Sequence, residues 1–325
     1  MERMTRTYYE TLNNFHSRIE SELTILLYHG VTRSKSRGIE NRSGKHMRAD
    51  IFADQMRYIK NNCTVLSMDE YLDINLNGQD LPPRSVVVSF DDGFRNNYSV
   101  AAPILHDLHM PAIFYISSGM VNTDLMFWVD VLEDCINLTS RHTISLKLNK
   151  NRSFPTRTEA QKLEALHSIK SYCKSVSQLE YKRVLNDLQS ATKITASVAH
   201  AENYEVIKWD ELREMDRDPL FTIGGHAMYH DILSQLPEDR LDLEIRTSLD
   251  LLHLHLGHGV EHYSYPEGQD NHYNEHIIRK LKGRGIICCP SAIPGLNPKG
   301  TDVFHLRRIM IGFAGIPFPY EDDQL

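Results

Sequence analysis

The chain has 325 residues, of which 41% are hydrophobic and 24% are charged, and its formal net charge is -7. This composition is ordinary for a globular protein, and the acidic balance argues against a nucleic-acid partner, because phosphate binding needs a basic surface. No stretch approaches the roughly 20 apolar residues that span a bilayer. The N-terminal extension, residues 1–23, is polar and lacks the apolar core of a signal peptide, so we expect a cytoplasmic location.

Apolar runs and helical periodicities alternate along the chain. In chain order we expect a strand over 24–28, a helix over 52–60, strands over 64–66 and 86–90, a helix over 98–108, strands over 112–116 and 220–223, a helix over 241–256, and strands over 261–265, 285–288 and 304–311. Repeated alternation of this kind predicts an α/β protein with a parallel sheet that is closed, or nearly closed, into a barrel.

A long insertion interrupts this alternation from about residue 122 to 203. Its periodicity is mainly helical, and it is too long for an ordinary connection, so we expect it to fold by itself within a single barrel domain that spans 24–325. Two interpretations are open. The insertion covers a functional site, or it is a solvated helical excursion without a catalytic role.

Two adjacent carboxylates, Asp91 and Asp92, follow the apolar run 86–90, and Gly93 ends that run. A buried strand cannot hold both acids unpaired, because burying an unpaired charge is costly. The two side chains must therefore lie at the end of the strand and face a cation, a substrate or solvent. This position predicts a functional site.

Two histidines four residues apart, His226 and His230, follow the expected strand over 220–223. If this segment is helical, the spacing places both imidazoles on one face, where they could bind one ion. One carboxylate and two imidazoles are a common catalytic metal set that leaves a coordination position for water.

A denser group of histidines lies at and after the end of the 241–256 helix and consists of His253, His255, His258 and His262. No carboxylate at the end of a strand accompanies this group. We therefore interpret these histidines as solvated turn residues and not as metal ligands.

The motifs resemble those of the polysaccharide deacetylases, the NodB-homology enzymes of carbohydrate esterase family 4. The family's Thr/Ser-Phe-Asp-Asp-Gly block is similar to residues 89–93, and its His-Ser/Thr-x-x-His block is similar to the histidine block at 224–230. A Trp-containing segment at 208–212 precedes the histidines, and residues 263–268 look like the family's third motif. The resemblance covers about residues 24–311, apart from the insertion.

The resemblance implies a distorted (β/α) barrel of seven or eight strands that carries one divalent metal ion, such as Zn²⁺. Asp92, His226 and His230 match the metal-ligand positions, and Asp91 matches the catalytic base. The implied reaction is hydrolysis of an N-acetyl group from an amino sugar or glycan precursor. Asp91 would take the proton as metal-bound water attacks the amide carbon.

Three further residues are candidates for binding the N-acetylated sugar that the resemblance implies as substrate. Tyr265 and Pro266 belong to the segment that looks like the third motif. Trp128, near the start of the insertion, could stack on a sugar face. A buried aromatic side chain that anchors the insertion to the barrel is the alternative for Trp128.

The general acid of this family is usually a histidine in a Leu-x-His motif near the C-terminus. Here the match is Leu27-Tyr28-His29, at the end of the first expected strand. A circularly permuted subset that acts on poly-N-acetylglucosamine carries this motif first, and the chain is similar to that subset. The resemblance therefore implies His29 as the acid, and a strand-end histidine bonded to the barrel is the alternative.

Two positions depart from the family's pattern. Ala227 stands where Ser or Thr usually follows the first histidine, and loss of such a supporting contact can cost about 10–100-fold in affinity or activity. Ser264 occupies the position of the third motif's arginine, which orients the base. Arg307 or Arg308 could replace it from the last strand, although the sequence favours solvated or structural arginines there.

Three functions remain consistent with the sequence. The first is a metal-dependent de-N-acetylase, and the second is an amidohydrolase of the same fold that acts on a non-sugar amide. The third is a non-catalytic relative that binds glycans. The presence of Asp91 and His29 disfavours the third function, whereas Ala227 and Ser264 keep it open.

Overall fold

The computed structural model describes residues 22–312, and this part of the chain divides into two compact units. Unit 1 contains the described residues up to Arg33, then Ser43–Val121, and those from Ile207 onward. Unit 2 contains Ser34–Arg42 and Asn122–Val206, so its larger segment overlaps the insertion predicted over 122–203. Residues 1–21 of the predicted N-terminal extension lie outside the described residues.

Unit 1 alternates strands and helices, as the sequence predicts. Its elements are β1 (Thr24–Tyr28), β2 (Gly30–Thr32), β3 (His46–Arg48), α2 (Ala49–Asn62), β4 (Thr64–Val65), α3 (Met68–Leu76), β5 (Ser85–Phe90), the π-helix η1 (Asn97–Ala101), α4 (Ala102–Asp107), β6 (Ala112–Ile116), α8 (Trp209–Asp216), β9 (Phe221–Gly225), the 3-10 helix η4 (Leu233–Gln235), α9 (Glu238–Leu256), α10 (Glu275–Lys282) and β10 (Ile309–Met310). Among the described residues, no helix has the length and apolarity that crossing a membrane requires.

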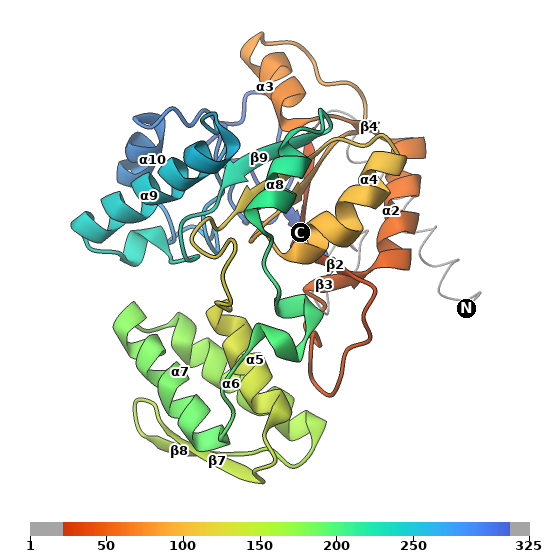
Figure 1. Ribbon diagram of the computed structural model, residues 1–325. Helices are drawn as coiled ribbons and strands as arrows, with labels where there is room; N and C mark the ends of the chain where they lie inside the picture. Colours follow the sequence, from red (N-terminus) through yellow and green to blue (C-terminus); the bar gives the residue numbers. More distant parts are fainter. Residues whose placement is uncertain (1–21, 313–325) are drawn as a thin grey trace. The chain divides into compact units, whose positions relative to one another are not determined.

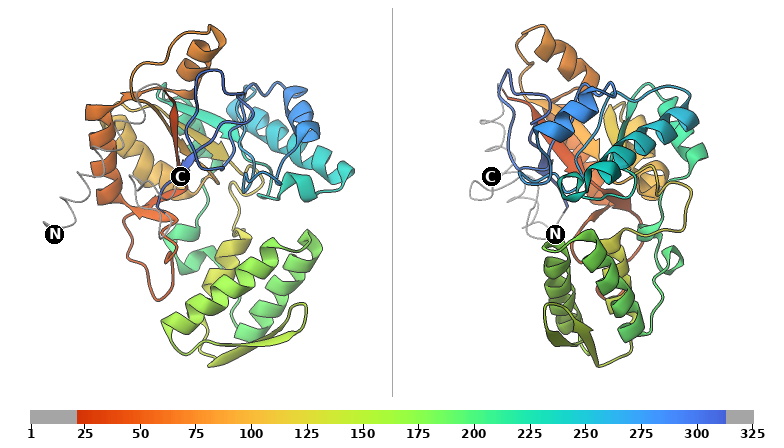
Figure 2. Two further views of the ribbon diagram at one scale, coloured as in Figure 1. Left: turned by 180° about the vertical axis from the view of Figure 1, so that it is seen from behind. Right: turned by 90° about the vertical axis from the view of Figure 1, so that its left-hand side faces the viewer.

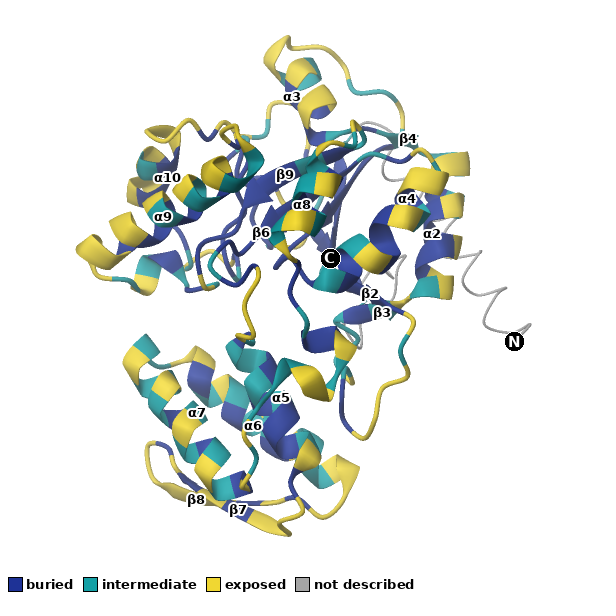
Figure 3. Ribbon diagram, in the orientation of Figure 1, coloured by how far each residue is buried: buried dark blue, intermediate teal, exposed yellow. Residues whose placement is uncertain are grey.

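A parallel sheet lies at the centre of unit 1 (Figure 1). Its strands follow the order β10-β1-β5-β6-β9, and β4 pairs with the start of β5. All these pairs are parallel, which confirms the α/β class with a parallel sheet. Strands β1, β5 and β6 are buried on both sides, which explains their continuous apolar runs (Figure 3).

The named strands form an open path and do not confirm the expected closed barrel. The strands expected over 261–265 and 285–288 are reduced to isolated bridges, Gly225 with Tyr263 and His262 with Cys288. The strand expected over 304–311 is reduced to β10. Three prolines and two glycines fall within 290–300, between the last two of these segments.

Helices α9 and α10 lie side by side in the views of Figures 1 and 2. Their buried side chains, such as Ile245 of α9 and Ile277 of α10, share one hydrophobic cluster with Tyr263 and Tyr265. Helix α9 therefore packs against the segment that follows it, close to the end of β9.

The side chains of His46 and Asn96 fill the space beside Gly30, which leaves no room for a side chain there. A Cβ atom at Gly30 would lie 2.0 Å from His46 Nδ1 and 2.7 Å from Asn96 Oδ1. We expect Gly30→Ala to lower the free energy of unfolding by about 1–3 kcal/mol, measured by urea denaturation. Gly259→Ala is the matched control, because a Cβ there meets no atom within 4 Å. Equal unfolding midpoints for the two variants would contradict this account of Gly30.

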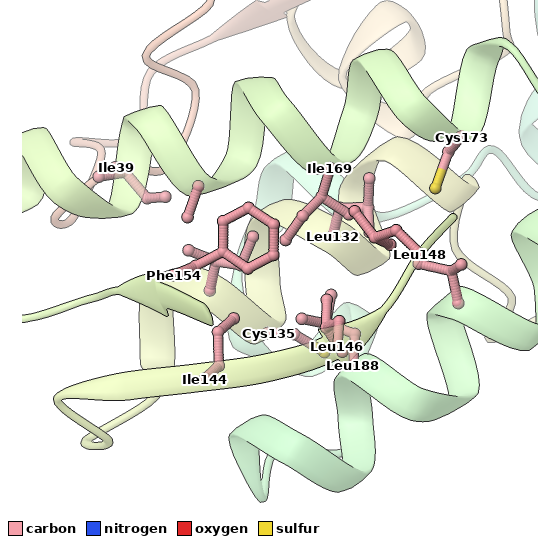
Figure 4. Close-up of a cluster of buried hydrophobic side chains, with 13 residues drawn as sticks. Ile39, Leu132, Cys135, Ile144, Leu146, Leu148, Phe154, Ile169, Cys173 and Leu188 are labelled. Carbon is pink, nitrogen blue, oxygen red and sulfur yellow. The ribbon is translucent and has the colours of Figure 1, made fainter. Parts of the chain in front are cut away.

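Unit 2 is mainly helical and has a core of its own. Its elements are α5 (Trp128–Leu138), β7 (Thr143–Lys147), β8 (Asn151–Pro155), α6 (Glu159–Lys174), α7 (Gln178–Thr192) and the 3-10 helices η2 (Val198–His200) and η3 (Glu202–Tyr204). In Figure 4, Leu146 and Phe154 of the β7–β8 hairpin lie in one cluster with Ile169 of α6 and Leu188 of α7. The alternating exposure along β7 places one face of the hairpin on this core.

Candidate metal and active site

Candidate residues from three separate segments follow the carboxyl ends of parallel strands. His29 follows β1, Asp91 and Asp92 follow β5, and His226 follows β9. The Asp91 N–H donates to the Tyr28 carbonyl at 3.0 Å and continues the β1–β5 pairing by one residue. Ligand sites of parallel α/β sheets lie at this edge.

Asp92, His226 and His230 form a group that could hold a metal ion, because one ligand atom from each lies within 4.8 Å of the others. Asp92 Oδ1 is 3.6 Å from His226 Nε2 and 3.4 Å from His230 Nε2. Two ligands of a tetrahedral zinc ion, each about 2.0–2.1 Å from it, lie roughly 3.3 Å apart. Within residues 22–312 this is the sole group of its kind.

Two of the three ligand atoms are buried without a hydrogen bond. Neither Asp92 Oδ1 nor His226 Nε2 has a hydrogen-bond partner among the described residues. Buried polar atoms are nearly always paired, so two unpaired acceptors that face each other fit a cation between them. His226 Nδ1 donates to the Ser264 carbonyl at 2.9 Å, which fixes the tautomer and leaves the Nε2 lone pair facing Asp92.

The carboxyl group of Asp92 is ionised in this environment. Burial by itself raises the pKa of Asp92, but the nearby imidazoles of His230 and His226 hold that pKa well below its ordinary value. The backbone of Asp92 is left-handed, with φ of 77°, a conformation that Asp tolerates better than most residues. Such strained positions concentrate at functional sites.

The segment from His226 to His230 is a turn and not the helix on which the four-residue spacing argument depended. Ala227 and His230 have φ angles of 60° and 61°, which lie in the left-handed region and exclude an α-helix here. The condition that the segment be helical is therefore not met. The two imidazole rings still meet, with centroids 4.9 Å apart, because the turn brings them together.

The loop after β6 joins the two segments that carry Asp92 and His226. The Ser117 N–H donates to the Asp92 carbonyl at 3.2 Å, and the Ser117 hydroxyl donates to the His226 carbonyl at 2.9 Å. The Ser118 N–H donates to the Ala227 carbonyl at 3.1 Å. These serines could not be predicted, since a serine pair after an apolar strand carries no distinguishing signal in the sequence.

A fully buried arginine holds Asp91. Arg308 donates to both carboxylate oxygens of Asp91 at 2.8 Å, and its Nε donates to the Ser291 carbonyl at 2.6 Å. The same guanidinium donates to the Ser264 hydroxyl at 2.7 Å. Of the two interpretations favoured for Arg308, solvated or structural, the solvated one is wrong, because its exposed fraction is 0% and its guanidinium nitrogens donate to Asp91, Ser264 and Ser291.

The electrostatic effect of this pairing is to keep Asp91 ionised. Burial by itself raises the pKa of Asp91, but Arg308 and His226 hold it below its ordinary value. Asp91 Oδ2 lies 3.9 Å from His226 Nε2, next to the candidate metal ligands. A carboxylate in this position can accept a proton at neutral pH.

His29 lies close enough to both carboxylates to interact with them. Burial lowers the pKa of His29 to about 4, although Asp92 and Asp91 act in the opposite direction. A histidine with this pKa is neutral at pH 7. Lys45, which no sequence motif indicates, also lowers the pKa of His29 and therefore belongs to the surroundings of the site.

The three candidates for substrate binding are placed differently. The Tyr265 side chain has an exposed fraction of 0%, and its hydroxyl donates to the Phe304 carbonyl at 3.2 Å. We expected this side chain to contact the substrate, but it is fully buried and belongs to a hydrophobic cluster of the core. Pro266 is also buried. Trp128 belongs to unit 2, where its ring centroid lies 5.6 Å from that of Tyr181, and its contact with a substrate stays a prediction.

The histidines near the end of α9 form no metal group among the described residues, but they are not all solvated. His253 and His255 lie within α9, and His255 stacks on Trp209 with ring centroids 3.9 Å apart. His262 is buried, and its Nε2 lies 2.7 Å from Asp69 Oδ1. The interpretation as solvated turn residues is wrong for His253 and His255, which are helical, and for His262, which is buried and bridges to a neighbouring segment inside unit 1.

Comparisons with known proteins identify the family. The sequence profile of the polysaccharide deacetylases matches residues 78–286, and the chain belongs to this family. The matched range includes Asp91, Asp92, His226 and His230, whereas His29 and Arg308 lie outside it. No curated protein matches the chain in a sequence search.

Solved structures share the fold at low sequence identity. IcaB from Ammonifex degensii is 18% identical, with a TM-score of 0.58 over 90% of this chain and 92% of that chain. The Streptococcus pyogenes deacetylase PplD, solved in complex with acetate, is 16% identical, with a TM-score of 0.59 over 92% of this chain and 95% of that chain. A de-N-acetylase from Aggregatibacter actinomycetemcomitans is 18% identical, with a TM-score of 0.53 over 88% of this chain and 94% of that chain.

Proposed function

We propose that this chain is a metal-dependent hydrolase that removes the N-acetyl group from an amino sugar in a glycan or a glycan precursor. The observation that carries the proposal is the group of Asp92, His226 and His230, with two unpaired buried ligand atoms, beside the ionised carboxylate of Asp91. Membership of the polysaccharide deacetylase family supports an N-acetylated carbohydrate as the substrate class.

Asp92, His226 and His230 would hold a single divalent ion, and zinc, cobalt and nickel all accept one carboxylate and two imidazoles. When bound, the ion would lower the pKa of a water molecule from ~15.7 towards 7 and polarise the acetyl carbonyl. The Ser264 carbonyl orients His226 for this task through the hydrogen bond to Nδ1.

In this proposal Asp91 accepts a proton from the attacking water as the new C–O bond forms at the amide carbon. Arg308 holds the Asp91 carboxylate in one orientation and keeps it ionised. The C–N bond then breaks, and His29 would donate a proton to the leaving amine. Because the pKa of His29 is about 4, His29 starts neutral, and the proton that it passes to the amine would be the one that Asp91 took from the water, so that Asp91 is ionised again at the end. The products are acetate and a free amino sugar.

Arg308 also bears on the alternative of a glycan-binding protein without turnover. One reason for that alternative was Ser264, which occupies the position of the arginine that orients the base. Arg308 supplies a guanidinium to Asp91 from another segment, and Ser264 contacts that guanidinium. This contact supports a catalytic site over a site that only binds.

A substrate panel tests the proposal. Acetate release would be measured with zinc-loaded protein for N-acetylglucosamine, its oligomers, a lipid-linked N-acetyl sugar and N-acetyl-lysine. We expect acetate from the sugars and little from N-acetyl-lysine. The lipid-linked sugar is included because it represents a glycan precursor, which would suit the predicted cytoplasmic location. Acetate mainly from N-acetyl-lysine would favour the non-sugar amidohydrolase, and oligomer binding without acetate release would favour the binding protein.

A further inference from the structure

A buried carboxylate from α9 lies against the turn that carries the two histidines. Glu244 Oε1 accepts hydrogen bonds from the N–H groups of Met228 and Tyr229, both at 2.9 Å. We propose that Glu244 is a positioning residue, which holds this turn in the conformation that directs His226 and His230 towards Asp92. The proposal rests on the proposed function, because it concerns the ligands of the same metal.

The conformation of the turn explains why it needs an acceptor. Ala227 and His230 adopt left-handed backbone angles, which non-glycine residues maintain only when surrounding contacts enforce them. Successive N–H groups in such a turn point to one side and form a concave site for an anion. The Glu244 carboxylate occupies this position for Met228 and Tyr229, and the Ala227 N–H donates to the Tyr263 hydroxyl at 2.8 Å.

The burial of Glu244 is otherwise unexplained. Its exposed fraction is 3%, and it lies on the buried face of α9 next to Ile245. Burial raises the pKa of Glu244, and the two backbone hydrogen bonds, together with Arg240, act in the opposite direction. A glutamate is almost never buried in this way unless it is paired, so the two backbone hydrogen bonds are the feature that accounts for its place.

Glu244 supports the turn at a place where residue 227 has no hydroxyl group to do so. Ala227 offers no hydroxyl to support the turn, and its side chain is buried in the hydrophobic cluster shared with α9. The hydrogen-bond acceptor for the turn is instead the Glu244 carboxylate of α9. The position of His230 therefore depends on how α9 packs, and not on the turn alone.

Zinc affinity tests this inference apart from turnover. The dissociation constant for zinc would be measured by competition with a chromophoric chelator for the wild type and for Glu244→Ala, Glu244→Asp and Glu244→Gln. We expect binding weaker by about 10–100-fold for Glu244→Ala and Glu244→Asp, because both withdraw the acceptor oxygen from the turn. Glu244→Gln should stay within about threefold of the wild type, because its amide oxygen can accept the same two N–H groups.

Asp250→Ala is the matched control, because it removes an exposed carboxylate from the same helix, and we expect it to leave the zinc affinity unchanged. The unfolding midpoint of the metal-free protein distinguishes the positioning role from a purely structural one. A purely structural role would lower this midpoint without changing the zinc affinity of the folded protein. If Glu244→Ala does not fold, the zinc affinities of Glu244→Asp and Glu244→Gln test the positioning role without it.

Equal zinc affinities for the wild type and Glu244→Asp would overturn the positioning role and leave the proposed function intact. A wild-type protein that binds no zinc would overturn the proposed function, and the positioning role with it.

Discussion

Asp91→Asn is expected to reduce kcat for acetate release by about 10²–10⁴-fold, because a neutral amide cannot accept the proton of the attacking water. Zinc affinity should change little, since Asp91 is not among the three candidate ligands. The substituted side chain keeps an oxygen that can accept from Arg308, but it loses the charge that balances this buried guanidinium. The measurement is steady-state acetate release at saturating substrate with zinc-loaded protein.

Folding must be checked in the same variant, because removing one partner of a buried ion pair costs about 3–5 kcal/mol. A thermal unfolding midpoint above the assay temperature establishes that the lost activity is not lost structure. Asp69→Asn is the matched control, because Asp69 also contacts a histidine of unit 1, His262, and should leave kcat unchanged. A folded, zinc-loaded Asp91→Asn protein with kcat within tenfold of the wild type would contradict the role of Asp91 as base.

Arg308→Met is expected to shift the acidic limb of the pH–rate profile to higher pH. Burial by itself raises the pKa of Asp91, and Arg308 is the main group that holds this pKa below its ordinary value. Without the guanidinium, burial dominates, and Asp91 becomes protonated, and therefore inactive as a base, over a wider acidic range. The measurement is kcat as a function of pH. A limb at the same pH in the wild type and in Arg308→Met would contradict the account of this pair.

The loss of stability in Arg308→Met should also depend on pH, and it should increase as the pH rises. In the wild type the lowered pKa of Asp91 stabilises the fold above the unfolded-state pKa of about 3.9, and this contribution is lost as the pH falls through the folded-state pKa. In the variant the folded-state pKa is raised, so burial of ionised Asp91 becomes destabilising as the pH rises. The deficit relative to the wild type should therefore grow towards neutral pH and reach about 3–5 kcal/mol in urea denaturation.

Arg307→Met is the control for both measurements. Arg307 is the exposed neighbour of Arg308, and it donates to the Pro294 carbonyl instead of to Asp91. We expect its pH–rate profile to match that of the wild type. A deficit in stability that is independent of pH in Arg308→Met would mean that lost packing, and not the charge of Asp91, determines the effect.

The parts of the site that could be predicted are those with a local signal in the sequence. Asp91 and Asp92 follow a run of buried residues, so the cost of burying charge places them at the end of a strand. The alternation of strands and helices predicts a parallel sheet, and such sheets bring the ends of their strands together. His226 follows the end of β9, so the same rule places it at this edge, and a turn instead of a helix carries it and His230.

The residues that support the site could not be predicted, because they act through contacts between distant segments. Arg308 pairs with a carboxylate 217 residues away, and nothing in the local sequence distinguishes it from Arg307. Glu244 occupies a buried position in an amphipathic helix, and its partners are backbone N–H groups that carry no sequence signal. Tyr265 belongs to a motif that suggested substrate binding, but packing places its side chain in the core.

Zinc titration of chelator-stripped protein, followed by acetate release from an N-acetylglucosamine oligomer, tests the central claim most directly. We predict no release before zinc is added, a linear rise with added zinc, and a plateau at one zinc per chain. This result would tie hydrolysis to a single ion held by Asp92, His226 and His230. Acetate release that is unaffected by stripping the metal would contradict the assignment of these residues as the ligands of a catalytic ion.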